Sequence, residues 1–261
     1  MSLMYFSIAI GATIIGSASG LGGGIIIKPI LDFLGHYNVV TISVLSCFTV
    51  FFMAVVSVIH QIRNKTKINF RRTGLIGIGA IIGGILGDQI MTLVLSVFNE
   101  LIVSITQSII LAILFILIYI YMNNKEKYKS YNVENWLACI SIGILLGTIA
   151  SFLSIGGGPI NVCILTIFFS MNPKESAVDA VAIMLFSQGS KLASIVQAGS
   201  IHNVDIGILL LMIAGGILGG LIGSKLNKRM KSEEILKMFN VFLVILIVLN
   251  IYNVFNAIIL C

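Results

Sequence analysis

The sequence predicts an all-α integral membrane protein built from two inverted-topology repeats. Of its 261 residues, 58% are apolar and only 10% are charged, whereas soluble domains carry about 25% charged residues. Apolar runs near or above the roughly 18 residues that cross a bilayer recur along the whole chain. Two glycine-rich segments, SGLGGGIIIKPIL at 19–31 and LSIGGGPINVCIL at 153–165, interrupt these runs. We expect one membrane domain at 1–261, with repeats at 1–122 and 136–261 and a linker at 123–135.

The first repeat begins with an apolar helix at 3–21, which ends at the first glycine segment. The following stretch, 25–34, is too short to cross a bilayer, so the two together form a discontinuous or re-entrant unit. Full spans follow at 39–61, 73–97 and 101–122. The first run has no basic region before it and no small-residue cleavage site after it, so we expect it to be retained rather than removed as a signal peptide.

The second repeat follows the same plan. A helix at 136–155 leads to the second glycine segment, in which Gly156, Gly157 and Gly158 align with Gly22, Gly23 and Gly24 at an offset of 134 positions. A short stretch at 159–170 comes next. Three spans complete the repeat, at 176–198, 206–224 and 236–260.

Basic residues gather in three short loops. The net charge is +6, but 13 of the 16 Lys and Arg residues lie at 63–72, 123–135 and 225–237, so the charge indicates topology rather than a nucleic-acid partner. Loops rich in Lys and Arg stay cytoplasmic, which places the turns at Glu100 and Asp205 outside. Each half is then one returning unit plus three spans. The two halves have opposite orientation, and both termini are extracytoplasmic in the cell membrane.

The two glycine segments are the candidate binding site. In each repeat the glycines come directly before a short helix, whose amino-terminal end carries about half a positive charge and free N–H groups. Pro159 stands at the first position of its helix, where a missing N–H costs nothing, and Pro29 lies within or near the first turn of the other. The sequence therefore predicts a site for a small oxyanion formed by glycine backbone and side-chain donors: Gly22, Gly23, Gly24, Gly156, Gly157, Gly158, Lys28, Ser19, Ser154 and Asn161.

A packing interpretation of the same glycines stays open. They could only allow close helix contact, with Lys28 extending its stem to the outer surface. Consecutive glycines favour the anion site, because packing glycines are usually spaced by four. Glycines with that spacing do occur and are assigned to helix contact: Gly79, Gly83 and Gly87, and again Gly215, Gly219 and Gly223.

Four polar residues within the spans are candidates for coupling transport to a proton or cation: Asp88, Asp179, Gln188 and Lys191. An ionised side chain at the membrane centre costs about 3 kcal/mol and is seldom without a function. Asp88 and Lys191 fall in the outer halves of their spans and could pair. Against a coupling role, the repeat aligns Asp88 with Ser224, which lies at a helix end beside a loop.

The cysteines give no sign of a disulfide framework, a metal site or a cofactor. Cys47, Cys139, Cys163 and Cys261 lie singly in apolar surroundings, without CxxC spacing or nearby histidines. We expect all four to be packing residues.

The paired GLGGGIIIKP and SIGGGP motifs, the size, the duplicated plan and the KINF segment before a glycine-rich span resemble the sulfite exporter TauE/SafE family. The second copy departs from the first at Ser154, Ile155 and Pro159, and has Cys163 where Pro29 stands. The resemblance implies a transporter, often dimeric, that moves sulfite, sulfonates or other small sulfur-containing or organic anions, driven by an ion gradient.

Inverted repeats with discontinuous helices are themselves a recurring plan of secondary transporters, which work by alternating access. Two other functions are weighed against this one. A passive anion channel would use the same helix ends. An intramembrane hydrolase is suggested only by SASG at 17–20, which lacks a leading glycine and a histidine deep in a later span to act as base, so we expect no enzyme activity.

Overall fold

The computed structural model describes residues 2–66, 69–199 and 204–259, and this part of the chain is helical throughout its regular elements. Residues 67–68 of the first basic loop, 200–203 of the turn before Asp205, and Cys261 lie outside the described residues. The elements in order are α1 (Ser2–Ser19), α2 (Gly24–Leu34), α3 (Val39–Arg63), α4 (Phe70–Val97), α5 (Glu100–Asn123), a 3-10 turn (Lys125–Lys127), α6 (Trp136–Phe152), α7 (Gly158–Phe169), α8 (Pro173–Gln197), α9 (Ile206–Arg229) and α10 (Ser232–Ile259).

Polar caps fix where several helices begin. A side-chain oxygen just before each of these helices accepts a hydrogen bond from a backbone N–H two or three residues later, which satisfies a donor that the helix itself leaves free. Because Asn172 caps α8 and Pro173 fits its first turn, α8 starts three residues earlier than the sequence predicts. The caps are Asn38 for α3, Asn69 for α4, Asn135 for α6, Asn172 for α8 and Asp205 for α9.

The predicted loop at 225–237 is mostly helical. α9 continues to Arg229 and α10 begins at Ser232, which leaves only Met230 and Lys231 between them. Lys and Arg are good helix formers, and positive charge is favourable in the last turn of a helix. The high charge of this stretch therefore marks a polar helix end rather than an extended loop.

Both predicted helix breaks are present. α2 has 11 residues and α7 has 12, so each is about 17–18 Å long and cannot cross a hydrocarbon core of about 30 Å. Pro159 lies in the first turn of α7, as predicted. Pro29 does not lie in the first turn of α2: it is the sixth residue, because the helix already begins at Gly24.

Helices of each half of the chain pack against helices of the other half. Glycines of α4 rest against backbone carbonyls of α6, and the matching glycines of α9 rest against carbonyls of α1. The carbonyls contacted in α6 and α1 are themselves separated by 134 positions, which is compatible with an internal duplication. The contacts join Gly79 to Ile140, Gly83 to Ile144 and Gly87 to Thr148, and they join Gly215 to Phe6, Gly219 to Ile10 and Gly223 to Ile14.

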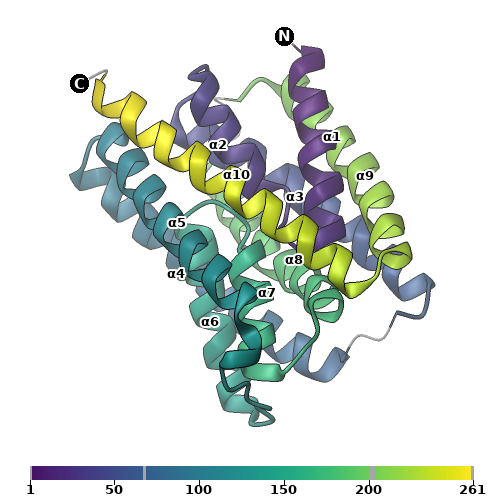
Figure 1. Ribbon diagram of the computed structural model, residues 1–261. Coiled ribbons are helices and arrows are strands. Elements are labelled where there is room, and N and C mark those ends of the chain that lie inside the picture. The colour runs from purple at the N-terminus through teal and green to yellow at the C-terminus, as the bar shows by residue number, and fades with distance from the viewer. Residues whose placement is uncertain (1, 67–68, 200–203, 260–261) are drawn as a thin grey trace.

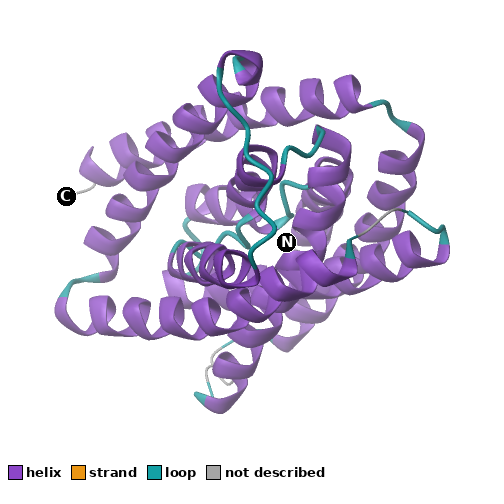
Figure 2. Ribbon diagram, turned by 90° about the horizontal axis from the view of Figure 1, so that it is seen from below, coloured by secondary structure: helices purple, strands orange, loops and turns teal. Residues whose placement is uncertain are grey.

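α8 is a central helix, packed against α3, α4 and α7. Six helices of the described chain, α1, α3, α4, α5, α9 and α10, are long and apolar enough to cross a membrane. α8 has 25 residues but carries polar residues that are shielded from lipid, including the buried Asp179, Gln188 and Lys191. Figure 2 shows long helices arranged around a centre that contains the loops of the breaks.

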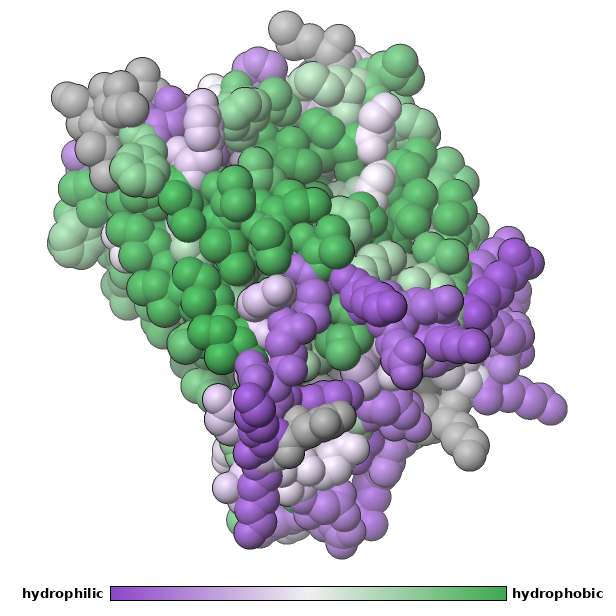
Figure 3. Space-filling view, viewed as in Figure 1, coloured by the Kyte–Doolittle hydropathy of each residue, from purple (hydrophilic) through white to green (hydrophobic). Residues whose placement is uncertain are grey.

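The molecule has two different ends. Both termini lie at the upper end in Figure 1, and hydrophilic residues gather at the lower end in the same view, below a hydrophobic belt (Figure 3). Hydrogen bonds tie the basic segments together there: Lys228 Nζ donates to Asn64 Oδ1 at 2.8 Å, and Lys174 Nζ donates to the Met230 carbonyl at 2.8 Å. At the other end the Tyr5 hydroxyl bonds His36 Nδ1 at 2.7 Å. We call these the basic end and the terminal end.

Replacing Gly83 with alanine should destabilise the protein, because the new Cβ would collide with the Ile144 carbonyl and push α4 away from α6. Overpacking of this kind costs about 1–3 kcal/mol. Gly74→Ala, on the same helix in open space, is the matched control and should be neutral or slightly stabilising. Thermal unfolding in detergent measures the difference, and equal melting temperatures would contradict the close α4–α6 contact.

Candidate functional site

The candidate site lies where the two helix breaks meet. α1 ends at Ser19 and α6 at Phe152, and the chain then turns through residues with positive φ before α2 and α7 begin. These include Gly22 at +75° and Gly157 at +79°, a left-handed region that glycine adopts without a steric penalty. Glycine is therefore needed here for backbone geometry.

The breaks contact each other reciprocally. A Cβ atom added at Gly158, the start of α7, would collide with the carbonyl oxygen of Leu21 in the first break. A Cβ added at Gly24, the start of α2, would lie 3.1 Å from the carbonyl oxygen of Ile155 in the second break. Leu21 and Ile155 occupy equivalent positions, as do Gly24 and Gly158. Each short helix thus begins against the backbone of the other break.

The meeting point itself is filled by protein. A Cβ at Gly22 would lie 2.5 Å from the Met184 sulfur, and one at Gly23 would lie 2.6 Å from a methyl group of Thr13. These glycines bring backbones together, as the packing interpretation expects, and the anion site at the neighbouring helix ends stays a prediction.

The predicted side-chain donors divide between the two breaks. Ser19 Oγ donates to the Ile15 carbonyl of its own helix at 2.7 Å. Lys28 is buried and forms an ion pair with Asp32 at 3.1 Å, one turn farther from the break. At the second break, Ser154 Oγ lies 3.2 Å from Ser43 Oγ. Asn161 is buried, and its Oδ1 has no hydrogen-bond partner in the described chain.

Lys191 also lies at the second break. Its ammonium donates to the carbonyl of Ser151 and to Ser154 Oγ, both at 3.0 Å. Gln188, one turn earlier on α8, is close enough that its Nε2 would lie 3.6 Å from a Cβ at Gly156. Of the four coupling candidates, the structure therefore brings Lys191 and Gln188 to the predicted anion site.

Asp88 lies apart from Lys191. It lines a cavity of about 260 Å³ between α3, α4 and α8, and a neighbouring cavity of about 620 Å³ shares its Asp88, Thr92, Ser194 and Ala198 walls. In the part of the chain that the structure describes, no ion pair within 4.0 Å joins Asp88 to Lys191.

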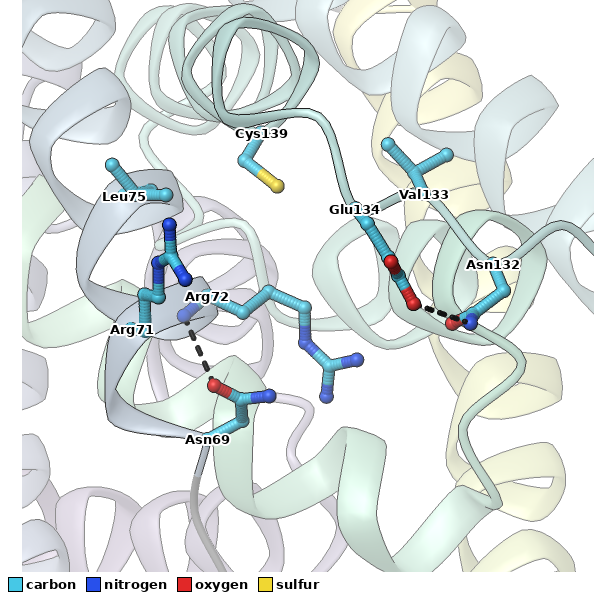
Figure 4. Close-up of a pocket in the computed structure, with 8 residues that line it drawn as sticks. All are labelled: Asn69, Arg71, Arg72, Leu75, Asn132, Val133, Glu134 and Cys139. Carbon is cyan, nitrogen blue, oxygen red and sulfur yellow. Dashed lines mark hydrogen bonds between the residues drawn. The ribbon is translucent and has the colours of Figure 1, made fainter.

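Asp179 lies at the basic end of α8. Its Oδ2 accepts a hydrogen bond from Thr73 Oγ1 at 3.0 Å and lies 3.7 Å from an Arg72 nitrogen. The Arg72 guanidinium also stands over the Phe169 ring at 5.0 Å from its centroid. Figure 4 shows Arg72 reaching from α4 into a pocket toward which Cys139 points from α6. Arg72 thus links α4, α7 and α8.

Several residues of this region were not singled out from the sequence. Ser43, Ser151 and Asn227 are single small polar residues in apolar helices, a pattern too common to signal a site. Asn227 Nδ2 donates to the Ala18 carbonyl at 2.7 Å and so caps the end of α1, as Lys191 caps the end of α6. Only the contacts between distant segments reveal these roles.

The hydrolase alternative finds no support at its serine. Ser17 Oγ lies 2.6 Å from Ser57 Oγ and also donates to the Gly220 carbonyl at 3.2 Å. These partners are neutral and cannot act as a base. Within the described residues, no group of three His, Cys, Asp or Glu side chains could hold a metal ion, and Cys47, Cys139 and Cys163 are buried free thiols.

Comparison with known proteins agrees with a transporter. The probable membrane transporter protein MJ0441 of Methanocaldococcus jannaschii is 27% identical over 248 residues, covering 87% of this chain and 86% of the relative. The probable membrane transporter protein YunE of Bacillus subtilis is 26% identical over 254 residues, covering 87% and 89%. No solved structure matches the chain.

Nearly the whole chain matches one family. The family described as "Sulfite exporter TauE/SafE" matches residues 5–250, which include both helix breaks and all of the long apolar helices but the first residues of α1 and the end of α10. This match agrees with the multi-pass helical fold and with the names of the two relatives. The chain therefore belongs to the sulfite exporter TauE/SafE family of membrane transporters.

Proposed function

We propose that the protein is a secondary transporter that moves a small anion across the cytoplasmic membrane by alternating access, driven by an ion gradient. The substrate is sulfite, a sulfonate or a related small organosulfur or organic anion, in line with the family description. The observation that carries this proposal is the reciprocal contact of Gly158 with Leu21 and of Gly24 with Ile155. It supports two helix amino termini converging in the middle of the fold.

Electrostatics favour an anion over a cation at this place. The first backbone N–H groups of a helix have no partner within the helix, and its amino terminus carries about half a positive charge. The ammonium of Lys191 adds a full charge at the second break, where its partners are the neutral Ser151 and Ser154. Gln188 is uncharged, so its amide adds hydrogen-bond donors for an anion without adding a negative charge that would attract a cation.

Alternating access requires that the two ends open in turn. The contacts of Arg72 with Asp179 and Phe169 hold α4, α7 and α8 together at the basic end. The cavity beside Asp88 and Ser194 lies toward the terminal end. We interpret this conformation as closed at the basic end, with the Arg72–Asp179 contact breaking when that end opens. The clustered Lys and Arg support a cytoplasmic basic end, with both termini outside.

Transport in proteoliposomes tests the function. Vesicles that contain the wild-type protein are loaded with unlabelled sulfite and placed in labelled sulfite. They should take up the label, because only a carrier exchanges one anion for another across the membrane. Gly158→Ala should abolish this uptake, since its Cβ collides with Leu21, whereas Gly11→Ala has open space around it and should transport normally. Conductance without counterflow would identify a channel. Absence of any movement of sulfite, sulfonates or carboxylates would overturn the transporter proposal for these anions.

Cysteine labelling on intact cells tests the orientation. Asn99→Cys lies in an exposed turn between α4 and α5, and Lys231→Cys lies in the exposed turn between α9 and α10. A membrane-impermeant maleimide should label position 99 on intact cells and position 231 only after permeabilisation. The reverse pattern would show that the basic end faces outward.

The native Cys139 reports opening of the basic end, because it lines the same pocket as Arg72. Arg72→Gln or Asp179→Asn should raise the rate at which N-ethylmaleimide alkylates Cys139 several-fold, as measured by peptide mass spectrometry. The rate at the buried Cys47 should not change, which excludes general unfolding. Arg63→Gln removes a charge at the same end without touching the contact and is the control. An unchanged rate at Cys139 in both variants would contradict the proposed closure.

A further inference from the structure

We propose that the anion binds at the second break alone, where Lys191 and Ser154 recognise it. The ligand class is a small oxyanion with a negative charge to match one ammonium. This inference rests on the proposed function and adds to it the residues that recognise the substrate. It also assigns the first break a purely structural role.

Lys191 is a buried cation without a fixed counter-ion. It is 2% exposed, and no carboxylate in the described chain lies within 4.0 Å of its ammonium. Its two hydrogen bonds, to the Ser151 carbonyl and Ser154 Oγ, use two of the three N–H donors that an ammonium carries. A buried charge needs a partner or costs several kcal/mol. A bound anion would satisfy both the charge and the third donor.

Lys28 differs in this respect. It is equally buried, but its charge is neutralised by Asp32 at 3.1 Å within the same helix. An anion placed beside Lys28 would meet the Asp32 carboxylate as well. Of the two buried lysines, Lys191 is therefore the better candidate for binding an anion, because its charge is not neutralised by a paired carboxylate among the described residues.

Ser154 adopts a backbone conformation that favours glycine. Its φ is +56°, in the left-handed region, and the equivalent residue of the first break is a glycine, Gly20, at +76°. A serine in this conformation is strained, so its presence calls for an explanation in its side chain. Ser154 Oγ accepts a hydrogen bond from Lys191 Nζ at 3.0 Å and lies 3.2 Å from Ser43 Oγ.

A cavity lies beside this cluster. Ser43, Asp88, Ser194 and Ile195 line the space of about 260 Å³, whereas Lys191 and Ser154 do not line it. Because the Asp88 carboxylate would repel an anion, the cavity is a route to the ammonium rather than the binding site itself. Ser43 links this cavity to the ammonium, because its Oγ lies 3.2 Å from Ser154 Oγ, which accepts a hydrogen bond from Lys191.

The equivalent place at the first break has lost these groups. α3 and α8 match at the offset of 134, so Lys191 corresponds to Ser57, Gln188 to Ala54 and Ser43 to Ala177. Where Ser154 meets Ser43, Gly20 meets Ala177: a Cβ at Gly20 would lie 2.8 Å from the Ala177 Cβ. The two breaks thus share their backbone contacts, while the polar cluster is confined to one of them.

Anion-induced thermal stabilisation tests this assignment on the purified full-length protein, because a ligand that binds only the folded state raises its melting temperature. The probes are sulfite, sulfate and methanesulfonate. Ser154→Gly suits the backbone and should melt at or above the wild-type temperature without ligand, yet lose most of the anion-induced shift. Lys191→Gln should weaken anion binding about tenfold or more, since a hydrogen bond to a charged group is lost.

Lys174→Gln is the matched control. Lys174 lies on the same helix and also donates to backbone carbonyls at a helix end, but it is 17 residues from Lys191, about 25 Å along the axis. Its variant should keep the wild-type anion response. If Lys191→Gln fails to fold, Ser154→Gly alone decides the question.

A wild-type anion shift in Ser154→Gly, or in a folded Lys191→Gln, would overturn the inference while leaving the transporter proposal in place. Failure of the proposed function is distinct, because the wild-type protein would then neither transport nor respond to any of the three anions.

Discussion

The contact between the two helix breaks is the constraint on which the rest of the structure depends. Non-helical backbone cannot face lipid, because its N–H and C=O groups would lack partners. Each break is therefore enclosed by protein, with Gly158 against Leu21 and Gly24 against Ile155. Placing both breaks at one point lets a single shell of long helices enclose both. The central position of α8, and the polar residues that it can carry, follow from this arrangement.

Contacts between helices of the two halves hold that shell together. α4 packs on α6 and α9 packs on α1. In each pair, three glycines of the first helix let the backbone carbonyls of the second helix approach closely. In a membrane such close van der Waals contacts replace the hydrophobic driving force between helices. α3 and α8 connect the two glycine-packed pairs, since α3 contacts α9 and α8 contacts α4. The alternating access that we propose would use the α3–α8 boundary, where Ser43 and Lys191 lie, as the surface between the two glycine-packed pairs.

The sequence predicted the breaks, the helix order and the grouping of basic segments, because glycine runs, apolar length and charge are local properties. It was less informative about α8. This helix is polar because it is buried among other helices, and its polar residues do not mean that it is short. The positions of Lys28 and Lys191 show the same limit. Lys28 is adjacent to the glycines in sequence but turns to Asp32, whereas Lys191, 33 residues beyond Gly158, reaches the break through tertiary contact. Proximity along the chain thus predicted where the two backbone breaks lie better than it predicted which charged side chains contact them.

The confinement of charge to one break has a physical reason. If both repeats kept a lysine at the position of Lys191, there would be two buried ammonium groups, and each would cost several kcal/mol without a partner. One small anion could neutralise only one of them. Ser57 at the equivalent position instead bonds Ser17 and the Gly220 carbonyl, which are neutral partners. A duplicated backbone with a single cation that lacks a paired carboxylate in the described chain keeps the symmetry that burial requires, and in our proposal it leaves one charge to match one substrate.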